Sequence, residues 1–194
     1  MRAIHPMKSG LAAGLLLGGA LVATNVTAAE YGIDVSGMHA AILFKASHIG
    51  ISFVTGRFNR FDGTFSWDEA KPAASSVDVT IQVDSLDTNH AERDKHLRSK
   101  DYLNAEQNPT AHFKSKKYDG DASGGKLSGD LTLNGVTKEI VINVTKIGEG
   151  KDPWGGYRAG FQGKTVLTSA EFGWTTPSFP KTVEMEFILE GKQK

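Results

Sequence analysis

Apolar and polar residues alternate along most of the chain after residue 30. Between residues 76 and 84, valines and an isoleucine fall on one face of an extended strand, and polar residues fall on the other. Alternation with a period of two is typical of a strand that is buried on one side. Similar segments predict about eight strands, at residues 41–48, 56–67, 76–84, 110–118, 126–133, 136–144, 157–167 and 183–190, with a short lead-in at 31–35.

Two of these strands are joined by Asn134-Gly135, a pair that is typical of two-residue hairpin turns. Closing the hairpin over this turn puts the apolar residues of both strands on the same face, so turn chemistry and hydrophobic pattern agree. Lys138 is the exception on that face, where its charge either extends outward into solvent or contacts a phosphate. The predicted pairs are Leu133 with Val136, Leu131 with Lys138, Gly129 with Ile140, and Leu127 with Ile142.

One region, residues 88–104, has a helical pattern. Asn89 followed by Glu92 is typical of a helix N-terminus, and we expect two short helices with a break near Ser99. Eight strands in an open sheet would leave exposed edges, which closure into a barrel removes. The predicted fold is therefore all-β, an eight-stranded antiparallel barrel with a short helical excursion between strands.

The inward face of this barrel decides whether it is filled or hollow, because eight strands enclose just enough space for either. Large apolar residues dominate the face, but Gly63, Gly129 and Gly163 lie among them. These glycines either leave a tunnel with apolar walls or only allow the strands to bend, and both interpretations stand. The wall candidates are Phe44, Phe58, Phe61, Phe65, Leu131, Ile140, Phe161 and Phe187.

The first 29 residues have the layout of a secretory signal peptide. Arg2 and Lys8 give a positive start, residues 10–26 are uncharged and mostly apolar, and Thr27-Ala28-Ala29 offers a cleavage site. Glycines and polar residues interrupt the apolar stretch, so a membrane-spanning anchor is not expected. We expect a leader at 1–29, a mature domain at 30–194, and export to the periplasm.

Composition narrows the chemistry and the partners. Residues 30–194 hold 20 of the 22 Lys and Arg residues and all 22 Asp and Glu residues, a formal charge of −2. Nucleic acid is not expected as a partner, because phosphate-binding surfaces carry a marked basic excess. The chain has no Cys, which excludes disulfides, iron–sulfur clusters and Cys nucleophiles.

A series of short motifs runs in order along nearly the whole mature chain. They are Gly37-Met38-His39 through Phe44, His48 through Ser52, Gly56-Arg57-Phe58, residues 79–88, Arg93 through Arg98 with Asp101-Tyr102-Leu103, residues 108–115 and 129–138, Arg158 through Phe161, and Glu171-Phe172-Gly173. Together they resemble the YceI-like family of periplasmic polyisoprenoid-binding proteins. Ala40 and Ser169 depart from the family, where Ser and Arg are common, so the preference for a headgroup stays open.

The resemblance implies a lipocalin-like extended barrel whose apolar interior holds an isoprenoid chain or another long-chain amphiphile. It implies no other cofactor, and it suggests a homodimer. Arg93 and His96 in the helical region are the headgroup candidates, since Arg matches phosphate geometry; the alternative is a solvated helix held by local ion pairs. His39 is a third polar candidate. None of the histidines forms a His-x-x-x-His pair, so no metal site is expected.

The function predicted is binding, sequestration or transport of a long-chain isoprenoid lipid, a polyprenyl phosphate or an isoprenoid quinone, in the periplasm. No Gly-x-Ser-x-Gly motif or glycine-rich phosphate loop occurs, so catalysis is not expected. Two alternatives stay open. One is an enzyme acting on such lipids, with His39 or His96 moving the proton; the other is a stress-related structural or interaction protein whose barrel is filled.

Overall fold

The computed structural model describes residues 28–177 and 179–194. The predicted leader therefore lies, except for its last two residues, outside the described residues. The strands are β1 (Ala29–Ile33), β2 (Ala41–His48), β3 (Ser52–Phe58), β4 (Phe61–Trp67), β5 (Ser76–Gln82), β6 (Leu86–Asp87), β7 (Thr110–Gly120), β8 (Gly124–Leu133), β9 (Val136–Lys151), β10 (Tyr157–Thr168) and β11 (Thr182–Gln193). The helices are α1 (Ala91–Arg98) and the short 3₁₀ turns η1 (Pro72–Ala74), η2 (Val83–Ser85) and η3 (Ser169–Phe172).

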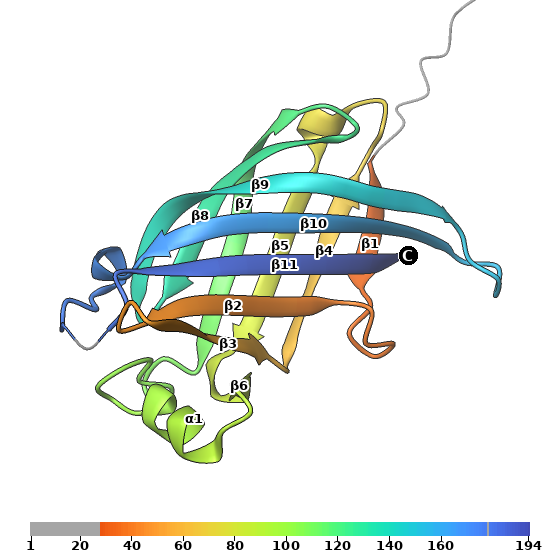
Figure 1. Cartoon of the computed structure of the whole chain (residues 1–194). Coiled ribbons are helices and arrows are strands. Elements are labelled where there is room, and N and C mark those ends of the chain that lie inside the picture. Colours follow the sequence, from red (N-terminus) through yellow and green to blue (C-terminus); the bar gives the residue numbers. More distant parts are fainter. Residues whose placement is uncertain (1–27, 178) are drawn as a thin grey trace, which may run out of the picture.

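The sheet closes because β11 has partners along both edges. On one edge it pairs with β10, and on the other it pairs first with β2 and then with β1. β1 and β2 thus form one interrupted barrel strand, from which residues 34–40 project (Figure 1). β3 with β4, and β6 with β5, continue the pattern as two further interrupted strands. Counted in this way, eight antiparallel barrel strands close the ring, which confirms the predicted fold class.

The predicted single strand over residues 56–67 is wrong in one respect, because it breaks between β3 and β4. There the Asn59 N–H donates to the Ser85 carbonyl (3.1 Å) and the Arg60 N–H to Ser85 Oγ (3.0 Å). These bonds to η2 replace ladder bonds, and the line of strands changes its partner from β2 to β1. The predicted hairpin register over Asn134-Gly135 is confirmed at all four pairs.

The helical excursion contains one α-helix rather than two. His90, and not Asn89, caps α1, because its Nδ1 accepts the Arg93 N–H (3.2 Å) while Asn89 takes a positive φ of 60°. Beyond the helix the chain forms turns, in which the Leu103 N–H donates to the Leu97 carbonyl (3.0 Å). This return over the helix end buries Leu103 against the barrel, so a second helix does not form.

Two of the three inward glycines serve close packing and not an open interior. A Cβ at Gly129 would overlap the Lys114 carbonyl and lie 2.7 Å from Cζ of Phe113, whose ring covers the position. A Cβ at Gly63 would likewise overlap the backbone of the neighbouring strand. Among Gly63, Gly129 and Gly163, only Gly163 lines the interior cavity. An open interior therefore does not depend on Gly63 or Gly129.

Candidate functional site

The barrel encloses an apolar cavity of about 520 Å³. Its walls come from nearly every barrel strand and consist mainly of aromatic and aliphatic side chains. One alternative from the sequence required a barrel that is filled by its own side chains. The cavity shows that this barrel is not filled. Seven of the eight predicted wall residues line the cavity, namely Phe44, Phe58, Phe65, Leu131, Ile140, Phe161 and Phe187. The eighth, Phe61, is buried in the core but is not among the lining residues.

Aromatic rings close the end of the cavity that lies away from α1. Trp67, near the end of β4, meets Tyr118 and Phe161 edge to face, with centroids 6.4 and 5.0 Å apart. The Trp67 indole N–H donates to Glu149 (2.9 Å), and the Lys146 ammonium lies 5.2 Å from the Trp67 ring centroid. The polar N–H of Trp67 thus has a partner while its ring lines the cavity, which is the usual arrangement of a buried Trp.

The opposite end of the cavity is its mouth, where exposed residues join the lining. His48 and Ile49, at the turn between β2 and β3, are both exposed and both line the cavity. The other side of the mouth carries Trp174 and Phe179, whose rings stack at 4.7 Å. The Trp174 indole N–H donates to the Tyr102 carbonyl (2.5 Å), which ties this loop to the segment after α1.

Arg93 and His96, the headgroup candidates from the sequence, both belong to α1 and line the cavity. Arg93 is fixed by Thr88, since its Nε donates to Thr88 Oγ1 (2.7 Å) and its Nη2 to the Thr88 carbonyl (2.8 Å). Thr88 in turn donates from its N–H and its hydroxyl to the buried Asp94. The His96 ring meets Tyr102 edge to face at 4.6 Å. The structure therefore brings these two residues together with the wall residues.

The sequence did not identify Tyr102 and Phe179 as mouth residues. The sequence does place large aromatic residues in these turn-rich segments, and such residues are not expected in a loop that is fully solvated. Pattern reasoning could not place them, because the two segments are 72 residues apart and meet only in the folded barrel.

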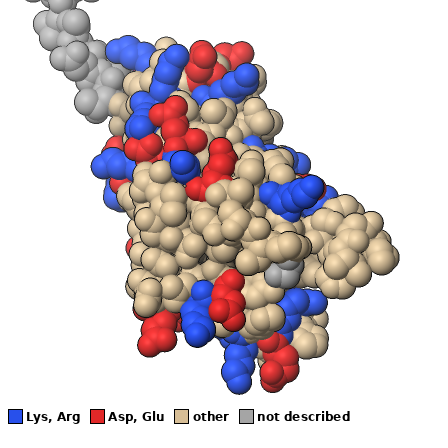
Figure 2. All heavy atoms as spheres, turned by 90° about the vertical axis from the view of Figure 1, so that its left-hand side faces the viewer, with Lys and Arg blue, Asp and Glu red and all other residues tan. Residues whose placement is uncertain are grey.

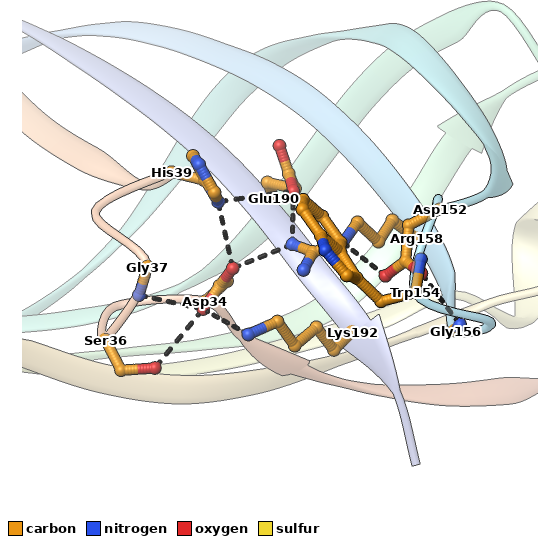
Figure 3. Close-up of polar contacts among 10 residues, drawn as sticks. All are labelled: Asp34, Ser36, Gly37, His39, Asp152, Trp154, Gly156, Arg158, Glu190 and Lys192. Carbon is orange, nitrogen blue, oxygen red and sulfur yellow. Dashed lines mark hydrogen bonds and ion pairs between the residues drawn. The ribbon is translucent and has the colours of Figure 1, made fainter.

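His39 lies elsewhere, in the segment between β1 and β2, and is not among the lining residues. Figure 3 shows it beside Asp34, Arg158 and Glu190. Its Nδ1 is 3.0 Å from Asp34 Oδ2, and Arg158 Nη1 donates to Asp34 (2.7 Å) and to Glu190 (2.6 Å). Lys192 Nζ adds a further ion pair to Asp34 at 3.0 Å. This network pins the projecting residues 34–40 onto β10 and β11.

The charge on Asp34 is balanced within the network. Burial would raise the pKa of this carboxyl group, but hydrogen bonds from Arg158, His39, Lys192 and the Gly37 N–H outweigh burial and hold its pKa well below the ordinary value. Oxygen and nitrogen atoms of Asp34, His39 and Glu190 lie within 4.8 Å of one another. Arg158 and Lys192 already form ion pairs with these carboxylates, so the arrangement suits an ion-pair network better than a metal ion.

Within residues 28–177 and 179–194, no helix combines the length and apolar character needed to cross a lipid bilayer.

Comparisons with known proteins agree with this architecture. The family model described as YceI-like domain matches residues 31–191. A UPF0312 protein of Ectopseudomonas mendocina is 52% identical over 188 residues, which cover 95% of this chain and 98% of the relative.

Solved structures share the fold. BcnA of Burkholderia cenocepacia has a TM-score of 0.71 at 22% identity and covers 81% of this chain and 98% of its own. A polyisoprenoid binding domain from Saccharophagus degradans, implicated in plant cell wall breakdown, has a TM-score of 0.62 at 20% identity and covers 87% and 100%. On the family match and the identity to its relatives, the chain belongs to the YceI-like family.

Proposed function

We propose that this protein binds a long-chain isoprenoid lipid, such as a polyprenyl phosphate or an isoprenoid quinone, and carries or sequesters it in the periplasm. The observation that carries the proposal is the cavity of about 520 Å³ with apolar walls. Its volume falls within the range of roughly 300–1,000 Å³ in which proteins bury one small ligand. An apolar chain that enters at the mouth would lie against the side chains of the wall.

The energetics favour a chain over a compact polar molecule. Each methylene group moved from water into an apolar site contributes about 0.8 kcal/mol, so binding needs no polar contact along the tail. One further isoprene unit inside the cavity should strengthen binding by at least about tenfold. Affinity should stop rising once the cavity is full, and the rest of a longer tail would extend through the mouth.

The polar end of such a lipid would lie at the mouth, beside Arg93 and His96. The position of Arg93 supports an anionic headgroup, because Thr88 holds its guanidinium group at the lining and Arg is well suited to phosphate. If this assignment is right, Arg93→Gln weakens binding of a polyprenyl phosphate more than binding of the matching polyprenol. Equal losses for the two ligands would contradict it.

The relationship to known proteins supports the class of ligand. The Saccharophagus degradans domain, described as polyisoprenoid binding, shares the fold, and the family match spans the cavity walls. The periplasmic part of the proposal depends on the leader expected at residues 1–29. Release of the mature protein from the periplasm by osmotic shock, with loss of that leader in its mass, tests it.

The test of ligand binding is native mass spectrometry with farnesol, geranylgeraniol and solanesol on protein first stripped of lipid. Affinity should rise with chain length until the cavity is full. Ile140→Trp narrows the cavity and should weaken uptake, whereas Val141→Trp, at the adjacent residue that is 47% exposed, should leave it unchanged. Equal binding of short and long alcohols, or uptake by Ile140→Trp at the level of the unmodified protein, would overturn the proposal.

A further inference from the structure

The turn between β2 and β3, together with the start of β3, exposes three apolar side chains beside the mouth of the cavity. Ile49, Ile51 and Phe53 are 77%, 82% and 62% exposed. We call these three residues the apolar tip. The turn ends on the left of Figure 1, on the same side as the loop that follows η3. Figure 2 faces this end of the molecule, where uncharged atoms cover the middle and charged side chains gather above and below.

The backbone of the turn holds an isoleucine in a strained conformation. Ile49 and Gly50 both have positive φ, 49° and 76°. Asn134 and Gly135 adopt nearly the same pair, 53° and 72°, with the residue types that such turns favour. A β-branched residue with positive φ is an outlier that carries a steric penalty. Stability alone would favour Asn at position 49, so the exposed isoleucine points to a function.

Ile49 belongs to two surfaces at once. It lines the cavity mouth and is also largely exposed to solvent. Whatever covers the apolar tip therefore adjoins the path by which a ligand enters or leaves. A long isoprenoid is held in a membrane and not in water, because its apolar surface disfavours solution.

We propose that the apolar tip inserts into the surface of a lipid bilayer and positions the cavity mouth there for loading or release of the ligand. The inference rests on the proposed function for its purpose. The strength of attachment at a bilayer surface scales with the apolar area buried there and with attraction to anionic lipids. Lys45 stands next to the tip, 4.8 Å from the Phe53 ring centroid, but Glu184 neutralises it at 2.8 Å. Attachment then depends on apolar contact more than on anionic lipid.

The small size of the apolar tip favours a bilayer over a second copy of the chain. A large aromatic side chain offers about 150–250 Å², so three partly exposed side chains, two of them isoleucines, stay well below the roughly 800 Å² that each partner contributes to a stable interface. A projecting turn is also poorly suited to matching itself across a two-fold axis, whereas a bilayer accepts it without shape complementarity.

The experiment compares flotation of the purified protein with vesicles of phosphatidylcholine and with vesicles of phosphatidylethanolamine and phosphatidylglycerol. The variant Ile49→Asn retains the turn, following Asn134, and Ile51→Asn removes the second isoleucine. Met38→Asn is the matched control, because Met38 is also 75% exposed with a positive φ (57°) but lies in the segment between β1 and β2. Each tip variant should lower the bound fraction by about tenfold on both vesicle types, and Met38→Asn should not.

Two further measurements separate this inference from the proposed function. Geranylgeraniol binding to Ile51→Asn in solution should be unchanged, because Ile51 lies outside the cavity lining, while its rate of ligand uptake from vesicles falls. The urea midpoint of Ile49→Asn should equal or exceed that of the unmodified protein, which shows that the fold is intact. Equal vesicle binding by all variants overturns the inference but leaves the proposed function standing. A dimer that the tip variants dissociate, without vesicle binding, overturns it in favour of a second copy.

Discussion

Asp94 should stabilise the mouth of the cavity, and its replacement by alanine offers a sharp test. Its carboxylate is buried and accepts two hydrogen bonds from Thr88, one from the N–H at 2.9 Å and one from the hydroxyl at 2.5 Å. Thr88 is buried as well, and it holds Arg93 through its hydroxyl and carbonyl oxygens. The variant Asp94→Ala would therefore leave a buried donor unpaired at the point where Arg93 is anchored.

The magnitude follows from these contacts. A buried donor left without a partner costs about 1–3 kcal/mol, and hydrogen bonds to a charged acceptor lie in the upper half of that range. The Thr88 hydroxyl can rotate away from the vacated position, so the Thr88 N–H is the donor left unpaired, and the expected loss is about 2–3 kcal/mol in the free energy of opening this segment. The neighbouring residue Glu92 is exposed on the same helix, and Glu92→Ala should change stability by less than about 0.5 kcal/mol.

Hydrogen exchange of the Thr88 amide measures the free energy of opening this segment, and urea unfolding measures the stability of the whole fold. Asp94→Ala should speed exchange of that amide and of α1, and Asp94→Asn, which keeps an acceptor oxygen, should have a smaller effect. Arg93 would lose its anchor, so Asp94→Ala should also weaken binding of a polyprenyl phosphate relative to the polyprenol. If Asp94→Ala protects Thr88 from exchange as well as Glu92→Ala does, the reasoning is refuted.

Three other predictions concern the barrel itself. Arg158→Met should lower the urea midpoint more than Arg60→Met, because the Arg158 side chain is 16% exposed in the network around Asp34 while Arg60 is 62% exposed; equal midpoints would contradict this. The folded pKa of Asp34 is lowered, so its stabilisation is full above the unfolded carboxyl pKa of about 3.9 and is lost on further acidification. The acid slope of the unfolding free energy should be shallower in Asp34→Asn. Gly129→Ala should destabilise by about 1–3 kcal/mol through overpacking, whereas Gly148→Ala, whose added Cβ meets nothing within 4 Å, should not.

The parts of the fold that the sequence predicts well are those fixed by local chemistry. The hairpin over Asn134-Gly135 is one, because the turn residues and the alternation in both flanking strands specify the same register. The interruption between β1 and β2 is different. Its geometry depends on an ion pair between Asp34 and Arg158, 124 residues apart, which no local pattern reveals.

The same distinction explains the candidate site. Inward positions follow from alternation, so most wall residues could be predicted, and Phe61 differs only in lying outside the lining. The role of a polar residue depends on which end of the barrel it reaches. His39 and His96 are both polar candidates from the sequence. In the structure His39 joins the Asp34 network, whereas His96 lies at the mouth. Only the closed sheet decides between them.

A hollow barrel also has a consequence for how its stability is measured. Its centre holds a cavity of about 520 Å³ where a filled barrel would have packed side chains, so the lining forgoes contacts that a ligand would supply. A ligand that binds only the folded state adds RT ln(1 + [L]/Kd), about 2.7 kcal/mol when its free concentration is 100 times Kd. That gain is as large as the loss expected for Asp94→Ala. Retained lipid would therefore mask the effect of a variant, and each unfolding free energy must be compared on protein stripped of lipid.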